Sequence, residues 1–290
     1  MHIPCTKIAQ ALEKELKKEV AHLKKKKQAL TLAVFLVGTS TQQLSFVKIK
    51  KQTAHRIGVK FEFIHIKTTP PFEKLVRLIR EKSHNPSITG IIIQQPLPAQ
   101  LSTDSIYDFI DIQKEIEGHR RKTQFYPPLG LAALTVLKYI FIHPKIDSKL
   151  FVDIKKDIPL LKKALKHKKI VIIGRGPTGG KPIGKILTEA KINFVSTNRQ
   201  TINPEEYYRE ADIIFTAVGQ KILNDQNIKN GAILINIGMR KENGRIKGDY
   251  DEKDIKNKAS FYTLTPGGIG PLDVLYLYKN LIDAAKMQGS

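Results

Sequence analysis

Residues 168–187, with the sequence KKIVIIGRGPTGGKPIGKIL, join an apolar run to a glycine-rich turn and then to a segment typical of a helix. Gly174, Gly176 and Gly179 have the G-x-G-x-x-G spacing directly after the predicted strand. In this setting the glycines permit a tight turn and the close approach of a pyrophosphate, and the following helix offers free N–H groups at its start. We therefore expect a dinucleotide at this turn. The alternative is a glycine-rich turn without a ligand.

The segment after the glycine turn favours NADP over NAD. An NAD site of this kind usually has Asp or Glu about twenty residues further on, where the acid binds the ribose hydroxyls. Here FVSTNRQT, at 194–201, has Ser196 and Arg199 but no acid, and Arg175 lies within the turn itself. Arginine binds a phosphate through two parallel hydrogen bonds, which suits the additional phosphate of NADP. The alternative is that either arginine is an ordinary surface residue.

Strand-like and helix-like segments alternate in both halves of the chain. In the first half, we predict strands at 31–38, 60–66 and 89–93, and helices at 8–27, 43–57 and about 72–83. In the second half, we predict strands at 169–174, 192–196, 212–219 and 231–238, and helices at 180–190, 204–211 and 271–287. This alternation implies parallel βαβ units, because two parallel strands need a crossover between them.

The prediction is therefore an α/β fold with two α/β domains. Residues 1–136, together with 271–290, form the first domain, to which the C-terminal helix returns. Residues 137–270 form a Rossmann-like dinucleotide-binding domain. A connecting helix is expected at 129–142, and the stretch 143–167 gives weak signals apart from a helical pattern near its end.

The composition restricts the class of protein. One cysteine excludes an intrachain disulfide, and no apolar run is long enough to span a bilayer, so we expect a soluble cytoplasmic protein. The 49 Lys and Arg against 27 Asp and Glu give a net charge of +22, which attracts polyanions. The lysines are spread over helical patterns, however, and no zinc-ligand cluster or nucleic-acid-binding motif accompanies them. Nucleic-acid binding therefore remains only an alternative.

One lysine in the first half is a candidate for chemistry. A catalytic lysine needs partial burial, which lowers the pKa of its ammonium group. Helical spacing places Phe46, Lys50 and Ala54 on one face of the predicted helix, whereas the neighbouring lysines point elsewhere. Gln94 ends a predicted strand, where α/β sheets commonly bind ligands. The alternative for Lys50 is a side chain that only covers apolar surface.

Motifs along almost the whole chain resemble the bifunctional methylenetetrahydrofolate dehydrogenase/methenyltetrahydrofolate cyclohydrolase family. FVKIKK at 46–51 is similar to the family's tyrosine, valine, two variable residues and catalytic lysine, and GIIIQQPLP at 90–98 resembles a strand ending Gln-Leu-Pro-Leu-Pro. KEIEGH at 114–119 resembles Lys-Asp-Val-Asp-Gly. GRGPTGGKP at 174–182 resembles Gly-Arg-Ser-x-x-Val-Gly-x-Pro, and TPGGIGPLDV at 265–274 resembles Pro-Gly-Gly-Val-Gly-Pro-Met-Thr.

The resemblance implies residue roles. Lys50 and Gln94 would be catalytic, and no metal is expected. The implied folate-binding residues are Phe46, Lys50, Gln94, Glu117, Gly267, Gly268, Pro271 and Asp273. The cofactor-binding residues, including those inferred from the glycine turn, are Gly174, Arg175, Gly176, Gly179, Ser196, Arg199, Gly219 and Met239.

Several positions depart from the family pattern. Phe46 replaces a tyrosine, which removes a hydroxyl near the lysine, and Glu117 replaces an aspartate, which moves the charge by one methylene. Asp273 stands where threonine is usual, and Gly176 stands where a serine touches the cofactor. These departures indicate a divergent member and affect the cyclohydrolase site more than the cofactor site.

The implied activity is NADP-dependent oxidation of 5,10-methylenetetrahydrofolate, followed by hydrolysis of the methenyl product to 10-formyltetrahydrofolate. The folate substrate would be a small molecule that the basic surface accepts in polyglutamylated form. The resemblance also implies a homodimer. The alternatives are a dehydrogenase with weak or lost cyclohydrolase activity, and a basic nucleic-acid-binding or regulatory protein on a degenerate enzyme fold.

Overall fold

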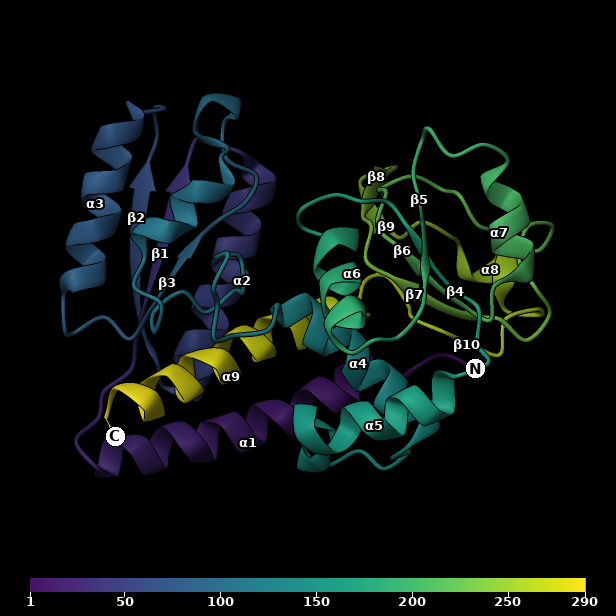
Figure 1. The fold of residues 1–290 in the computed structure, drawn as a ribbon, viewed down its shortest axis with the longest axis horizontal. Helices are drawn as coiled ribbons and strands as arrows, with labels where there is room; N and C mark the ends of the chain where they lie inside the picture. Colours follow the sequence, from purple (N-terminus) through teal and green to yellow (C-terminus); the bar gives the residue numbers. More distant parts are fainter. Residues whose placement is uncertain (290) are drawn as a thin grey trace. The chain divides into compact units, whose positions relative to one another are not determined.

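The structure is a computed structural model that describes residues 1–289, and these residues form two compact units (Figure 1). We call the first the lysine unit; it contains Glu13–Pro128 and the chain from Val274 onward. The second, the glycine-turn unit, contains Met1–Leu12 and Leu129–Asp273. The C-terminal segment thus returns to the lysine unit, as the sequence predicts.

The lysine unit is built on a parallel three-stranded sheet of order β2-β1-β3. Its elements, in chain order, are the part of α1(Cys5–Lys25) from Glu13 onward, β1(Thr31–Val37), α2(Thr41–Ile57), β2(Lys60–Ile66), α3(Phe72–His84), β3(Gly90–Ile93), two short 3-10 helices η1(Ala99–Leu101) and η2(Asp104–Phe109), and most of α9(Gly270–Gln288). Every residue of β1 is buried, because this central strand is covered on both faces. Gly58 ends α2 with φ 86°, a conformation that favours glycine.

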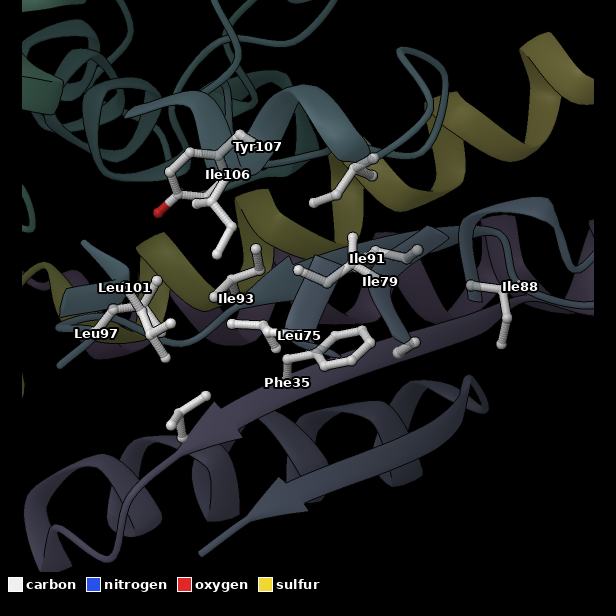
Figure 2. Close-up of a cluster of buried hydrophobic side chains, with 13 residues drawn as sticks. Phe35, Leu75, Ile79, Ile88, Ile91, Ile93, Leu97, Leu101, Ile106 and Tyr107 are labelled. Carbon is white, nitrogen blue, oxygen red and sulfur yellow. The ribbon is translucent and has the colours of Figure 1, made fainter. Parts of the chain in front are cut away.

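The core of this unit lies between the sheet and α3. Phe35, Ile91 and Ile93 from the strands pack with Leu75 and Ile79 from α3 (Figure 2). The apolar residues of α3 recur at helical spacing, so one stripe of the helix is buried and its charged face stays in water. This packing fixes the position of β3 and therefore the position of Gln94, which follows this strand.

The glycine-turn unit contains a parallel five-stranded sheet of order β10-β7-β6-β4-β5. Its elements are α4(Pro128–Phe141), η3(Ser148–Leu150), α5(Ile154–Leu165), β4(Ile170–Ile173), α6(Gly180–Glu189), β5(Val195–Thr197), α7(Pro204–Glu210), β6(Ile213–Thr216), β7(Ile233–Asn236), β8(Arg240–Glu242), β9(Arg245–Lys247), α8(Glu252–Ile255) and β10(Phe261–Tyr262). The parallel order and the strand–turn–helix start are those of a dinucleotide-binding sheet.

Two details differ from the predicted elements. β5 begins at Val195 rather than 192, because the N–H groups of Lys191 and Ile192 still bond back to Thr188 and Leu187 at the end of α6. The antiparallel pair β8-β9 and the two-residue strand β10 were not predicted from the sequence. They are too short to show a repeating apolar pattern.

The boundaries of the units also differ from the predicted domain limits at 136 and 270. Residue 136 lies inside α4, and this helix packs on α6: a Cβ at Gly130 would lie 3.0 Å from the Pro182 carbonyl oxygen. The first residues of the chain join the same unit, because Ile3 donates a backbone hydrogen bond to Tyr262. No helix within residues 1–289 is long and apolar enough to cross a membrane.

A buried ion pair organises the stretch 143–167, for which the sequence signals are weak. Lys138 on α4 contacts the carboxylate of Asp157 on α5 at 2.5 Å and donates to the Phe151 carbonyl at 3.1 Å. The Asp157 carboxylate also accepts the Asp153 N–H. Both charged side chains are almost fully buried, so each satisfies the other.

Replacing Lys138 by Met is expected to lower the free energy of unfolding by about 3 kcal/mol or more, because Asp157 loses its buried counter-charge. Urea unfolding followed by circular dichroism measures this loss. The matched control is Lys169→Met, which breaks a pair with Glu210 on the surface and should leave stability almost unchanged. Equal effects of the two substitutions would contradict the assignment of a structural role to the buried pair.

Candidate active site

The side chains of Lys50 and Gln94 meet in the lysine unit. Lys50 lies on the buried face of α2, and Gln94 directly follows β3. The Lys50 Nζ donates a hydrogen bond of 2.9 Å to the Gln94 Oε1, and the two residues are only 9% and 7% exposed. Lys48 and Lys51 on the same helix are exposed. The buried face thus distinguishes one lysine from its neighbours.

A carboxylate completes this group. Glu117 Oε1 lies 3.9 Å from Lys50 Nζ, whereas Glu115 points into the local turn. The Glu115 carboxylate accepts the N–H groups of Glu117 and Arg120 and so holds the turn together. Gly118 has φ 75°, and a Cβ there would lie 2.7 Å from the Phe125 carbonyl oxygen. The KEIEGH segment therefore has one structural acid and one acid that faces the lysine.

The Glu117 carboxyl group has an unusual protonation equilibrium. Burial raises the pKa of Glu117, and the Lys50 ammonium group lowers it only in part. The side chain is 16% exposed, and its charged form lacks the strong donors that a buried carboxylate needs. Such a group suits a ligand that brings its own N–H donors.

Phe46 lies one turn before Lys50 on α2 and is half-buried. It supplies an aromatic ring to this part of the helix and no hydrogen-bonding group. Among residues 1–289, no group of three or more His, Cys, Asp or Glu side chains could hold a metal ion. The polar groups that meet at this site are an amine, an amide and a carboxyl group.

The glycine turn has the geometry of a dinucleotide site. Gly174 has φ 99°, and a Cβ there would lie 2.7 Å from the Ala217 carbonyl oxygen. A Cβ at Gly179 would collide with the Ala217 side chain, so glycine at this position lets the turn approach the end of β6. A Cβ at Gly176 would meet nothing within 4 Å. Gly174 and Gly179 are thus required by packing. Gly176 leaves open space in front of the turn, which fits a pyrophosphate.

Arg175 and Ser196 form a contact beside the turn. The Arg175 Nη2 donates to the Ser196 carbonyl oxygen at 2.6 Å, and its Nε donates to the Ser196 hydroxyl at 3.3 Å. The contact joins the ends of β4 and β5, which are neighbouring strands. Arg199 is exposed two residues after β5. Two guanidinium groups thus belong to the same edge of the sheet.

Gly219 and Met239 also lie together. They follow β6 and β7, and a Cβ at Gly219 would lie 3.0 Å from the Met239 carbonyl oxygen. Sequence reasoning missed the residue that orders these loops, Asp249. Its buried carboxylate accepts the N–H groups of Val218 at 2.9 Å and Gln220 at 3.1 Å. Burial raises the pKa of Asp249, and these N–H groups counteract that effect.

The loop before α9 contains the last predicted ligands and belongs to the glycine-turn unit. Gly267 has φ 96°, and Gly268 approaches the Leu264 carbonyl so closely that a Cβ would lie 2.6 Å from its oxygen. Gly268 therefore has a packing reason to be glycine, independent of any ligand. Pro271 is exposed and Asp273 is half-buried in the first turn of α9.

A parallel sheet with a glycine turn, together with a second unit that buries a lysine beside an amide and an acid, defines an α/β enzyme with a dinucleotide site. Residues 3–117 match the catalytic domain of tetrahydrofolate dehydrogenase/cyclohydrolase, and residues 157–289 match the NAD(P)-binding domain of the same family. The chain belongs to the tetrahydrofolate dehydrogenase/cyclohydrolase family.

Individual relatives agree with this family. The bifunctional protein FolD of Staphylococcus carnosus is 30% identical over 294 residues, which cover 97% of this chain and 95% of the relative. FolD of Thermodesulfovibrio yellowstonii is 32% identical over 285 residues, with the same coverage. The crystal structure of the bifunctional enzyme FolD from Campylobacter jejuni has a TM-score of 0.85, with 26% identity and 99% of both chains covered. The resemblance seen in the motifs and the two α/β domains are confirmed.

Replacing Glu117 by Gln is expected to stabilise the protein at neutral pH and not at acidic pH. The raised pKa means that the folded state disfavours the carboxylate, so the wild type loses stability as the pH rises above the ordinary glutamate pKa. The gain of the variant should therefore be small near pH 4.5 and reach its maximum above the folded-state pKa. Urea unfolding at several pH values measures it.

The control for this experiment is Glu210→Gln. A hydrogen bond from Lys169 lowers the pKa of Glu210, so its carboxylate contributes stability that is present at neutral pH and lost as the pH falls. This substitution should therefore give no gain and at most a small loss at neutral pH, because the pair is exposed. A loss of stability in Glu117→Gln at neutral pH would show that Lys50 compensates the buried charge fully.

Proposed function

We propose that this chain oxidises 5,10-methylenetetrahydrofolate with NADP and then hydrolyses the methenyl product to 10-formyltetrahydrofolate. The observation that carries the proposal is the buried contact between Lys50 and Gln94, beside Glu117, in a chain with an intact glycine turn. This combination provides a proton-transfer group in one unit and a dinucleotide site in the other.

Lys50 is the proton-transfer group of the hydrolytic step. Water adds to the methenyl carbon and loses a proton, the bond from this carbon to the ring nitrogen N5 breaks, and N5 takes up a proton. The neutral form of the amine accepts the first proton, and the ammonium group that results donates the second. The Gln94 Oε1 accepts a hydrogen bond from Lys50 Nζ and so directs the amine, which otherwise moves on a flexible four-carbon side chain.

Glu117 binds the pterin ring. Its carboxylate has few donors of its own, and the amino and ring N–H groups of a pterin supply two parallel ones. Glutamate reaches one methylene further than aspartate, so the pterin would lie slightly further from the turn at 115–118. The energetic cost of burying this carboxyl group is then offset when the substrate binds.

The glycine turn and its two arginines bind the cofactor. When bound, the nicotinamide supplies the hydride acceptor for the oxidation. Gly174 and Gly176 admit the pyrophosphate, and Arg175 and Arg199 bind the 2′-phosphate that distinguishes NADP from NAD. The backbone at Gly219 and Met239 borders the same edge of the sheet. We also propose that the protein is a cytoplasmic homodimer, and sedimentation would test the dimer. We propose further that it uses polyglutamylated folate, which a comparison of mono- and polyglutamylated substrates would test.

Replacing Lys50 by Met should reduce cyclohydrolase turnover by about 10²–10⁴-fold, because general acid–base catalysis contributes factors of this size. Dehydrogenase turnover should fall much less, since no proton passes through the amine in that step. Hydrolysis of methenyltetrahydrofolate, followed by its absorbance, measures the effect. Lys48→Met and Lys51→Met alter exposed lysines of the same helix and should keep wild-type turnover. Full hydrolysis in Lys50→Met would refute the catalytic assignment.

Replacing Arg175 and Arg199 together by Ala should raise the KM for NADP about 10–100-fold and change the KM for NAD much less. Both arginines are exposed, so the net loss of their charge-assisted hydrogen bonds to the 2′-phosphate is about 1.4–2.8 kcal/mol, which corresponds to this factor. Dehydrogenase assays with both dinucleotides measure the ratio. Arg209→Ala, which breaks a surface pair with Glu205, is the control. An unchanged NADP preference in the double variant would contradict this assignment.

A further inference from the structure

Two polar side chains of α9 contact the backbone beside the catalytic group. The Tyr278 hydroxyl donates a hydrogen bond of 2.6 Å to the carbonyl oxygen of Lys50. The Asn280 Nδ2 donates to the carbonyl oxygens of Ile116 at 2.8 Å and Tyr126 at 3.0 Å. Both residues are buried, and Tyr278 is fully inaccessible to water. All of these residues belong to the lysine unit.

We infer that Tyr278 and Asn280 are positioning residues of the active site, Tyr278 for Lys50 and Asn280 for Glu117. The inference rests on the proposed function of those two residues. It assigns the C-terminal helix a role in catalysis, which Tyr278 and Asn280 exert through backbone carbonyl groups.

Tyr278 acts on the helix that carries the lysine. The hydroxyl contacts the Lys50 carbonyl and the Ala54 N–H, which are partners four residues apart in a regular helix. Burial raises the pKa of Tyr278, so the hydroxyl remains a donor throughout the working pH range. This contact fixes the position of the Lys50 backbone, and the side-chain amine must reach Gln94 from that position. A small shift of α2 would therefore lengthen the Lys50–Gln94 contact.

Asn280 acts on the turn that carries the glutamate. Its amide group has two N–H donors, and both are used, one on each side of the loop at 116–126. Ile116 immediately precedes Glu117, and Gly118 packs against the Phe125 carbonyl in the same loop. The Glu115 carboxylate holds the Glu117 N–H from the other direction. The backbone of Glu117 is thus held on both sides.

The helix α9 is held in place by further contacts, so its docking does not depend on these two residues. Leu281 packs against β3, where a Cβ at Gly90 would lie 2.6 Å from its Cδ1. The Gln288 side chain donates to the carbonyl oxygens of Thr89 and Gln113 at the far end of the helix. Removal of one hydroxyl is therefore expected to shift the active-site geometry without undocking the helix.

The experiment compares two separately assayed activities of the full-length enzyme. Tyr278→Phe removes only the hydroxyl and should lower the ratio of cyclohydrolase to dehydrogenase turnover by about 5–20-fold, because misplacement of a catalytic group by about 1 Å costs up to 10²-fold. This ratio does not depend on the fraction of folded enzyme. A loss that is equal in both activities would show a purely structural role and would overturn the assignment of Tyr278.

Asn280→Ala should give a different signature. The KM for the folate should rise about tenfold in both activities, while the ratio of the two turnover numbers stays near that of the wild type. Asn280→Ser keeps one hydrogen-bond donor and should restore part of the KM. An unchanged folate KM in Asn280→Ala would overturn the assignment of Asn280, and so would equal values in the Ala and Ser variants.

Two controls separate these effects from general destabilisation. Gln288→Ala weakens the docking of α9 at its far end, and Tyr262→Phe removes a tyrosine hydroxyl that contacts Glu252 in the other unit. Both should keep the wild-type ratio and KM. Lys50→Met distinguishes failure of the inference from failure of the proposed function. If it abolishes hydrolysis while Tyr278→Phe changes nothing, the function holds and the positioning role is wrong.

Discussion

The site depends on burying an ammonium group next to an amide and a carboxyl group. Removing such a group from water is costly unless neighbouring atoms replace the lost hydrogen bonds. Lys50 is almost fully buried, so its amine requires the hydrogen bond to Gln94 at 2.9 Å, and Glu117 lies nearby. This requirement links α2, the end of β3 and the turn at 115–118. The same requirement explains why backbone supports from α9 converge on these elements.

Both units place their chemistry at the carboxyl ends of parallel strands. Gln94 follows β3, Gly174 follows β4, and Gly219 and Met239 lie in the loops after β6 and β7. Strands of this type leave their last carbonyls and the following loops at one edge, where helix N-termini also begin. Two units with the same layout can therefore provide a proton-transfer group and a dinucleotide site without sharing any side chain.

Two buried carboxyl groups differ in the hydrogen-bond donors that surround them. The pKa of Glu117 and the pKa of Asp249 are both raised by burial. Asp249 has backbone N–H donors that compensate in part, and it orders the loops next to Gly219. Glu117 has fewer fixed donors, and the charged group nearest to it is the Lys50 amine at 3.9 Å. The number of fixed N–H donors thus distinguishes these two carboxyl groups, although burial raises the pKa of both.

The sequence by itself determined the parallel α/β class, the glycine turn, the end of α2 at Gly58 and the buried face with Lys50, because these features are encoded by local spacing. Local spacing did not reveal β10, the choice of Glu117 over Glu115 as partner of the lysine, or the support from Asp249. The contact between Tyr278 and Lys50 joins residues 228 positions apart. Only the tertiary structure decides such contacts, because they depend on how packed elements meet and not on any repeat within one element.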